Sequence, residues 1–262
     1  MIFDGYLICS DFDGTFFCSG GRISEENCRA VRYFQDNGGR FTIATGRSPE
    51  FVAGFPQFQC NAPVIACNGT MICDAETGKR LWEAMLPESA GAMMDEMSRC
   101  PWTQRIYLCD AYGQGNEWTP EMGPPSAHFA KIPRPWYKVL FHQAIEDTPR
   151  LQAYAQEHFG GEYAVDRSYP MGVELHILGS GKGECLAQMR RLLPEVQVIV
   201  GVGDYENDVT LIRMADIGYA VDNAVPEAKA VADRITVKND EHAIARIIEA
   251  LEKEIREGGT DK

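Results

Sequence analysis

Short apolar runs alternate with helical patterns near the start of the chain, and this alternation most constrains the fold. The runs at residues 6–9, 41–44 and 64–67 are typical of buried strands. Between them, Ser24 is a good helix N-cap followed by apolar residues at helical spacing, and Pro49 begins a second helical segment. Strands separated by helices predict a parallel sheet with helices on its faces, which is the α/β class.

The pattern changes in the middle of the chain. Within residues 83–178, a helix followed by paired strands occurs twice, around a proline-rich passage at 118–135. This arrangement predicts a small α+β domain. Gly179-Ser180-Gly181 then predicts a hinge, after which strands and helices alternate again. We therefore expect a discontinuous core, residues 1–82 and 179–262, with an α+β cap inserted at 83–178.

Composition limits the possible partners. The chain has 262 residues, 45% of them hydrophobic, which is sufficient for a large core. Its formal net charge of −13 disfavours binding to nucleic acid or to anionic membranes. A small phosphorylated substrate stays compatible, because a bound divalent cation reverses the local sign. No apolar stretch is long enough to span a bilayer.

The cysteines indicate a reducing compartment. There are nine, an odd number, with no Cys-x-x-Cys pair. We interpret them as reduced, mostly buried thiols of a cytoplasmic protein. Two irregular segments are also expected, a turn at residues 110–115 and a frayed end at 258–262.

Four polar signals end or follow the predicted elements. They are Asp11 with Asp13, Thr45, Lys182, and the segment Gly203-Asp204-Tyr205-Glu206-Asn207-Asp208. Taken singly, each has an ordinary explanation: a solvated turn, a helix cap, a loop lysine, or acids at a helix start. All four in this order, each beside an apolar strand or a glycine hinge, are difficult to obtain by chance. Ligands bind at the carboxyl ends of strands in open α/β sheets.

Phosphoryl transfer explains this combination. Asp11, Asp204 and Asp208 supply the oxygen ligands that Mg²⁺ prefers. The cation and Lys182 would neutralise the phosphoryl oxygens, and Thr45 would add a hydroxyl donor. Asp11 can then attack phosphorus and form an aspartyl phosphate.

A second carboxylate is needed for the leaving group. Asp13 would protonate the leaving alkoxide and later activate water. Asp204 and Asp208 are four residues apart at a helix start, which places them on one face, and Asn207 would hold the outer shell of the metal site.

These motifs resemble those of the haloacid dehalogenase (HAD) superfamily, and within it the Cof-like phosphatases with a type IIB cap. The motifs are Asp-Phe-Asp-Gly-Thr, Ala-Thr-Gly-Arg, Gly-Lys-Gly and Gly-Asp-Tyr-Glu-Asn-Asp. The resemblance implies a HAD-like Rossmannoid parallel sheet with an inserted α+β cap that supplies substrate specificity. It implies that Asp11 is the nucleophile and Asp13 the general acid/base.

The resemblance also implies the binding residues. The Mg²⁺ ligands would be Asp11, the backbone carbonyl of Asp13, and Asp204, supported by Asn207 and Asp208. The phosphate would be bound by Thr45 and Lys182. Gly46 and Arg47 are possible substrate contacts, although a structural ion pair explains Arg47 about as well.

We therefore predict a Mg²⁺-dependent phosphatase of small phosphorylated metabolites, sugar phosphates above all. A sugar phosphomutase and a non-catalytic phosphate-binding module stay open as alternatives. A metal-dependent glycosyltransferase leaves Thr45 and Lys182 without a role, a P-loop lacks its upstream glycine because His176 stands there, and Asp13 argues against dehalogenation. The physiological substrate and the oligomeric state are not predicted. Cap residues that could contact the leaving group are Trp118, Trp136, Tyr137, Tyr169 and Glu174.

Overall fold

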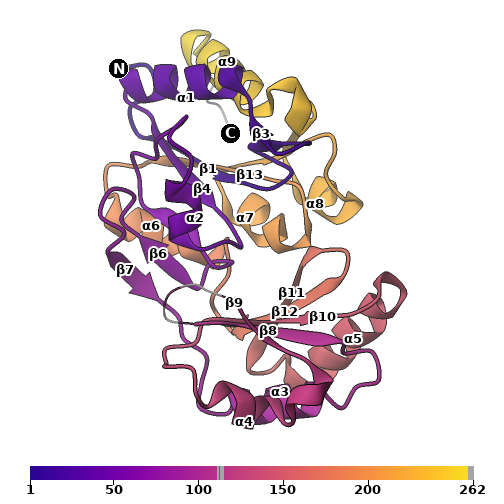
Figure 1. Cartoon of the computed structure of the whole chain (residues 1–262). Coiled ribbons are helices and arrows are strands. Elements are labelled where there is room, and N and C mark those ends of the chain that lie inside the picture. Colours follow the sequence, from indigo (N-terminus) through magenta and orange to yellow (C-terminus); the bar gives the residue numbers. More distant parts are fainter. Residues whose placement is uncertain (111, 113–114, 259–262) are drawn as a thin grey trace.

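The larger of the two main sheets has eight strands in the order β15-β14-β13-β1-β4-β5-β6-β7 (Figure 1). The computed structural model describes residues 1–110, 112 and 115–258, so half of the predicted turn at 110–115 and all of the predicted frayed end except residue 258 lie outside the described residues. The strands of this core sheet are β1 (Tyr6–Asp11), β4 (Arg40–Ala44), β5 (Val64–Ala66), β6 (Met71–Cys73), β7 (Arg80–Glu83), β13 (Val198–Gly203), β14 (Ile217–Ala220) and β15 (Arg234–Ile235).

Part of this sheet departs from the predicted parallel arrangement. The strands from β15 to β5 are parallel, but β6 and β7 pair antiparallel at the edge. The chain reverses through Asn68-Gly69, where both residues have positive φ. An Asn-Gly dipeptide between apolar runs is a hairpin signal, so the sequence does carry an indication of this turn.

Alternation along β1 explains the layered core. Leu7 and Cys9 pack into one apolar cluster, which includes Leu186 of α6, while Ile8 packs into the cluster on the opposite face. Helices α1 and α9 contribute to this second cluster and pack against each other. The helices of the core are α1 (Glu25–Asp36), α2 (Pro49–Ala53), α6 (Glu184–Leu192), α7 (Val209–Met214), α8 (Pro226–Val231) and α9 (Ala243–Arg256). A small hairpin, β2 (Phe17–Cys18) and β3 (Arg22–Ile23), follows β1.

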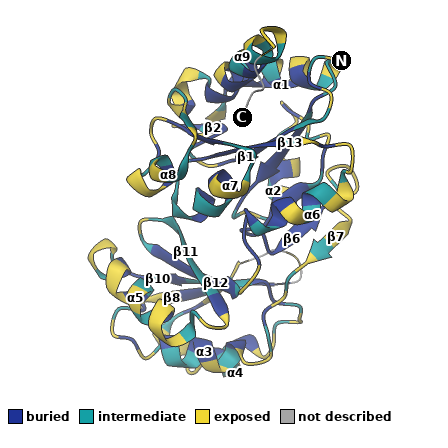
Figure 2. Ribbon diagram, turned by 180° about the vertical axis from the view of Figure 1, so that it is seen from behind, coloured by how far each residue is buried: buried dark blue, intermediate teal, exposed yellow. Residues whose placement is uncertain are grey.

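The second large sheet is antiparallel and has the order β11-β12-β10-β8-β9. Helices α3 (Ala90–Met97), α4 (Pro125–Phe129) and α5 (Thr148–Phe159) lie on its side away from the core (Figures 1 and 2). Its other face is directed toward the core sheet. The strands of this cap sheet are β8 (Arg105–Cys109), β9 (Gly115–Trp118), β10 (Lys138–His142), β11 (Tyr163–Tyr169) and β12 (Gly172–Ile177). The domain boundaries at residues 82 and 178 stay a prediction.

Strand β13 runs further than its apolar pattern indicates. The pattern at residues 196–200 is typical of a strand that ends at Val200, but β13 continues to Gly203. Gly201 lies under α7, where a Cβ atom would be 2.6 Å from the carbonyl oxygen of Leu211. The glycines therefore allow a helix to pack closely on the strand rather than ending it. Short 3₁₀ turns occupy Pro120–Met122, Ile145–Asp147, Glu206–Asp208 and Asn239–Glu241.

All nine cysteines are free, and eight of them are buried. Among the described residues, the helices are too short or too polar to cross a lipid bilayer. The cytoplasmic location stays a prediction.

Candidate active site

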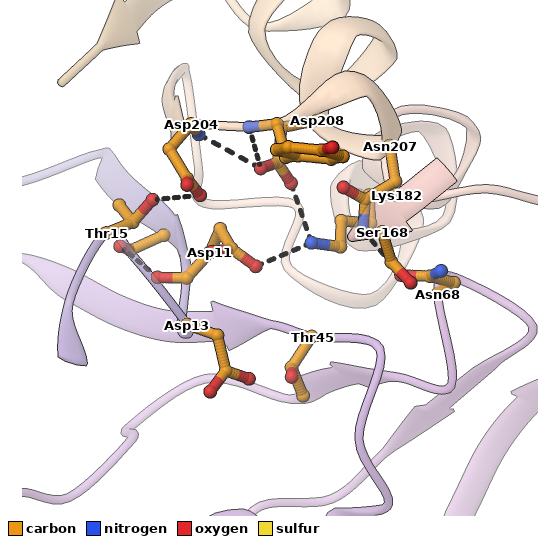
Figure 3. Close-up of polar contacts among 12 residues, drawn as sticks. Asp11, Asp13, Thr15, Thr45, Asn68, Ser168, Lys182, Asp204, Asn207 and Asp208 are labelled. Atoms are coloured by element: carbon orange, nitrogen blue, oxygen red, sulfur yellow. Dashed lines mark hydrogen bonds and ion pairs between the residues drawn. The ribbon is translucent and has the colours of Figure 1, made fainter. Parts of the chain in front are cut away.

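Three polar side chains meet at one edge of the core sheet because they end or follow neighbouring parallel strands. Asp11 is the last residue of β1, Thr45 follows β4, and Asp204 follows β13. The order β13-β1-β4 places Asp11 between the other two (Figure 3). This is the carboxyl edge of the sheet, where the α/β architecture creates its binding crevice.

Lys182 joins this group from a distant part of the sequence. Its Nζ lies 2.6 Å from Asp11 Oδ1 and 2.6 Å from Asp208 Oδ1, and its side chain is 1% exposed. Gly181 precedes it with a φ of +141°, which brings the lysine back toward the sheet after the cap. A buried ammonium between two carboxylates forms charge-assisted hydrogen bonds that fix the geometry of both acids.

The loop after β13 is held by Asp208. Its Oδ2 accepts hydrogen bonds from the backbone N–H groups of Asp204 at 3.0 Å and Tyr205 at 3.1 Å. Thr15 Oγ1 donates to Asp204 Oδ1 at 3.1 Å. Between them, Gly14 has a φ of +82°, and a Cβ there would lie 2.4 Å from Asp204 Oδ2. The turn after Asp11 thus requires glycine for its conformation and for its close approach to Asp204.

The carboxylates of Asp11, Asp204 and Asp208 form the one group among the described residues with metal-ligand spacing, with ligand atoms within 4.8 Å of one another. Burial and the neighbouring Asp208 raise the pKa of Asp204 to about 7. The same causes raise the pKa of Asp11 even though Lys182 opposes them. Three acids thus face one ammonium, so the donor set fits a hard divalent cation that would complete the charge balance.

Asp13 lies apart from this group. Its carboxylate forms a bidentate ion pair with Arg47, with Nε to Oδ2 at 2.7 Å and Nη2 to Oδ1 at 2.9 Å. Both side chains are 46% exposed. The Arg47 guanidinium also lies 4.1 Å from the centre of the Phe51 ring. Two roles were considered for Arg47, a substrate contact and a structural ion pair, and the structure contains the ion pair.

Thr45 is fully buried at the base of the site. Its Oγ1 accepts a hydrogen bond from the backbone N–H of Arg47 at 3.1 Å, and its own N–H donates to the carbonyl of Ile65. Because Oγ1 acts as an acceptor in this bond, the Thr45 hydroxyl keeps its proton for donation. Gly46 follows, at the mouth of the site.

A polar network that we did not predict joins the loop after β13 to the cap. Asn207 Nδ2 donates to Asn68 Oδ1 at 2.9 Å, and Asn68 Nδ2 donates to Glu174 Oε2 at 2.6 Å. Lys138 Nζ donates to the same Glu174 oxygen at 2.7 Å, and Ser168 donates to its other oxygen. The side-chain amide of Asn207 thus donates its hydrogen bond to Asn68. The turn at Asn68 has a local sequence signal, but the contacts of Asn68 with Glu174 and Asn207 join residues far apart in the sequence and have none.

A cavity of about 490 Å³ lies between the core and the cap. The core contributes residues 46–48, and the cap contributes Tyr107, Cys109, Gly115, Lys138, Leu140, His142 and Tyr169. Of the aromatic residues considered for the leaving group, Tyr169 lines this cavity. Trp118 and Trp136 are buried in the apolar core of the cap, and Tyr137 is buried and donates to Glu83.

The sequence matches the model of the haloacid dehalogenase-like hydrolase family over residues 8–248. The chain belongs to this family. The match spans both the site and the cap, which agrees with the resemblance carried by the four motifs.

Relatives of this hydrolase include phosphatases. A Bacillus subtilis 5-amino-6-(5-phospho-D-ribitylamino)uracil phosphatase is 26% identical over 247 residues, which cover 92% of this chain and 94% of the relative. A haloacid dehalogenase-like hydrolase from Bacteroides thetaiotaomicron has a similar structure, with a TM-score of 0.73 and 25% identity, covering 94% of this chain and 98% of the other. A subclass IIB sugar phosphatase shares the fold with a TM-score of 0.74 at 17% identity, covering 93% and 98% of the two chains.

Proposed function

We propose that this hydrolase is a Mg²⁺-dependent phosphatase that acts through an aspartyl phosphate on Asp11. The observation that carries the proposal is the contact of Lys182 with both Asp11 and Asp208, beside Asp204. A phosphate monoester repels a carboxylate nucleophile unless its charge is offset. The ammonium and a cation held by the acids, with the backbone carbonyl of Asp13 as a further ligand, would supply this charge.

In the first step, Asp11 attacks phosphorus while Lys182 holds one carboxylate oxygen of Asp11 in place. Lys182 and the Thr45 hydroxyl bind phosphoryl oxygens, and their fixed positions reduce the reorganisation that the reaction requires. A bound Mg²⁺ would supply Lewis-acid stabilisation of the phosphoryl charge. Asn207 and Asp208 position this machinery through their contacts with Asn68 and with the loop backbone.

Asp13 carries the proton in both steps. It donates a proton to the leaving oxygen, then accepts one from the water that hydrolyses the aspartyl phosphate. For this, the carboxyl group exchanges its ion pair with Arg47 for contacts with the substrate. The half-exposed positions of both side chains permit this exchange, and Arg47 then becomes available to the substrate.

The proposed substrates are small phosphorylated metabolites, sugar phosphates above all. Names of relatives support this class, since one acts on a phosphoribitylamino compound and one structural neighbour is a sugar phosphatase. The cavity beside Gly46 has the volume range of small-ligand sites.

Turnover of p-nitrophenyl phosphate tests the proposal. We expect hydrolysis with Mg²⁺, loss of hydrolysis with EDTA, and a loss of at least about 10³-fold in kcat for Asp11→Asn. Asp74→Asn, in a turn outside the acid cluster, is the control and should keep wild-type activity. Mg²⁺-independent turnover, or an Asp11→Asn variant as active as the control, would contradict the proposal.

A further inference from the structure

The cap-sheet face directed toward the core carries polar side chains at alternate positions. Along β10, Val139 and Phe141 are fully buried in the apolar core of the cap, whereas Lys138, Leu140 and His142 line the cavity. This two-residue period is the ordinary pleat of a strand. Two of the three cavity-facing positions of β10 therefore present nitrogen atoms to whatever occupies the cavity.

Lys138 is the first of these groups. Its side chain is 11% exposed, and Nζ lies 3.6 Å from the position that a Cβ of Gly46 would take, beside the turn after β4. Although burial alone lowers the pKa of Lys138, the contact with Glu174 raises it, so the ammonium persists. An ammonium has three donors, and Glu174 takes one of them. The others can serve an oxygen in the cavity.

The second group is His142. Its Nδ1 is buried and has no hydrogen-bond partner within the described part of the chain. Its ring lies 6.2 Å from the ring of Tyr169, which also lines the cavity. A buried ring nitrogen without a partner is unfavourable unless a ligand or water supplies one.

The cation on the cap side of the cavity is balanced. Lys138 is paired with Glu174, and this pair is not used in the proposed proton transfer. A second anionic group at the leaving-group end of the substrate would thus meet an ammonium that is already neutralised. Hydroxyl groups suit the site better, because they accept from an ammonium and can either accept from or donate to an imidazole.

We propose that Lys138 and His142 bind oxygen atoms of the leaving group and thereby select phosphomonoesters of uncharged, polyhydroxylated alcohols. This proposal rests on the proposed phosphatase function and assigns the selection to two named side chains. Tyr107, Leu140 and Tyr169 line the same cavity and contact the carbon skeleton. Glu174 is a positioning residue, because it holds the Lys138 ammonium through their ion pair.

His142→Phe gives the first test, because it keeps the ring and removes its nitrogens. The substrates are n-hexyl phosphate, which has no free hydroxyl group, and a panel of phosphorylated hexoses and hexitols with the same number of carbons. We expect the wild type to prefer at least one hydroxylated member. For this substrate, the variant should lose at least about tenfold in kcat/KM, mainly through KM. The reason is that a substrate hydroxyl group in the cavity loses the ring nitrogen as its hydrogen-bond partner. The value for n-hexyl phosphate should stay within about twofold, since that substrate has no such partner.

Lys138 needs a paired variant, because Lys138→Met alone leaves Glu174 as an uncompensated buried charge. In Lys138→Met/Glu174→Gln both charges are removed, and we expect the same selective loss for the hydroxylated substrate. Lys138→Arg should retain part of the preference. Exposed Lys131→Met and His158→Phe are matched controls with no expected effect.

The outcomes separate this proposal from the function on which it rests. An equal loss on both substrate types, or a wild type that hydrolyses n-hexyl phosphate as well as every hydroxylated member, overturns the selection by Lys138 and His142. Mg²⁺-dependent and Asp11-dependent turnover of p-nitrophenyl phosphate would stand in that case. Absence of this turnover in the wild type would instead refute the phosphatase.

Discussion

At the scale of single residues, the site is organised by one buried cation. Lys182 is fully enclosed, and both of its partners, Asp11 and Asp208, are buried acids. Removing one partner of a buried ion pair costs more than the pair itself contributes, because the remaining charge is left in a poorly solvated place. The same lysine therefore serves both stability and the proposed chemistry.

Lys182→Met should lower the free energy of unfolding by about 3–5 kcal/mol in EDTA, because two buried carboxylates lose their counter-charge. Urea unfolding measures this change. In Lys182→Met/Asp208→Asn the loss should be smaller than the sum of the single effects, since one acid no longer needs a partner. Additive losses would show that the two side chains act independently.

The raised pKa of Asp204 predicts a pH dependence of stability. Between pH 3.8 and about 7, the unfolded chain has released this proton while the folded protein keeps it. The folded state then binds more protons, so stability in EDTA should fall as the pH rises through this window. Asp204→Asn should show a flatter curve of thermal unfolding against pH. Parallel curves for the two proteins would contradict the assignment.

At the scale of elements, tight turns bring the loops of the site together. The turn after β1 depends on Gly14, whose φ is positive and whose α-carbon faces Asp204. The loop after β13 is closed by Asp208. These two turns bring Asp11 and Asp204 together, although 192 residues separate them in the sequence.

Gly14→Ala should reduce stability by about 1–2 kcal/mol and weaken the apparent affinity for Mg²⁺, because the new methyl group displaces Asp204. Gly21→Ala is a matched control: Gly21 has a φ of +78° and nothing within 4 Å of the added Cβ. Gly21→Ala therefore has only the free-energy cost of a positive φ in alanine, without any new contact of the methyl group. Equal Mg²⁺ dependence of activity in the two variants would show that contact with Asp204 is unimportant.

The sequence predicted those parts of the site that follow strands in order. Asp11 and Asp204 could be placed together because each lies a few residues after an apolar run that predicts a strand, and parallel strands bring their carboxyl ends to one edge of the sheet. The contacts of Lys138 with Glu174, and of Asn68 with both Glu174 and Asn207, were missed. They depend on how the cap docks, which no local periodicity encodes.

At the scale of the whole molecule, the cap and the core are held in contact by polar and thiol groups. Arg167 of the cap pairs with Glu206 of the core at 2.9 Å. Cys67 and Cys109 lie on opposite sides of the same boundary, with their Sγ atoms 3.5 Å apart. Release of product requires these surfaces to separate if the cap covers the site during turnover.

Oxidation with diamide should cross-link the cap to the core through Cys67 and Cys109. The reagent accepts two electrons and two protons as the Cys67 and Cys109 thiols form one disulfide. We expect activity to fall at least about tenfold, because product leaves only when the cap opens, and a reducing thiol should restore it. Cys109→Ser should resist inactivation. Peptide mapping checks the pairing, and full activity of the cross-linked protein would contradict a need for opening.

The most direct test of the account is a rapid acid quench during the first turnover, followed by mass spectrometry of the peptide that carries Asp11. We predict that this peptide gains one phosphoryl group in the wild type and none in Asp11→Asn. An unmodified peptide at all quench times spanning the first turnover, or a phosphoryl group found on another residue, would contradict Asp11 as the nucleophile.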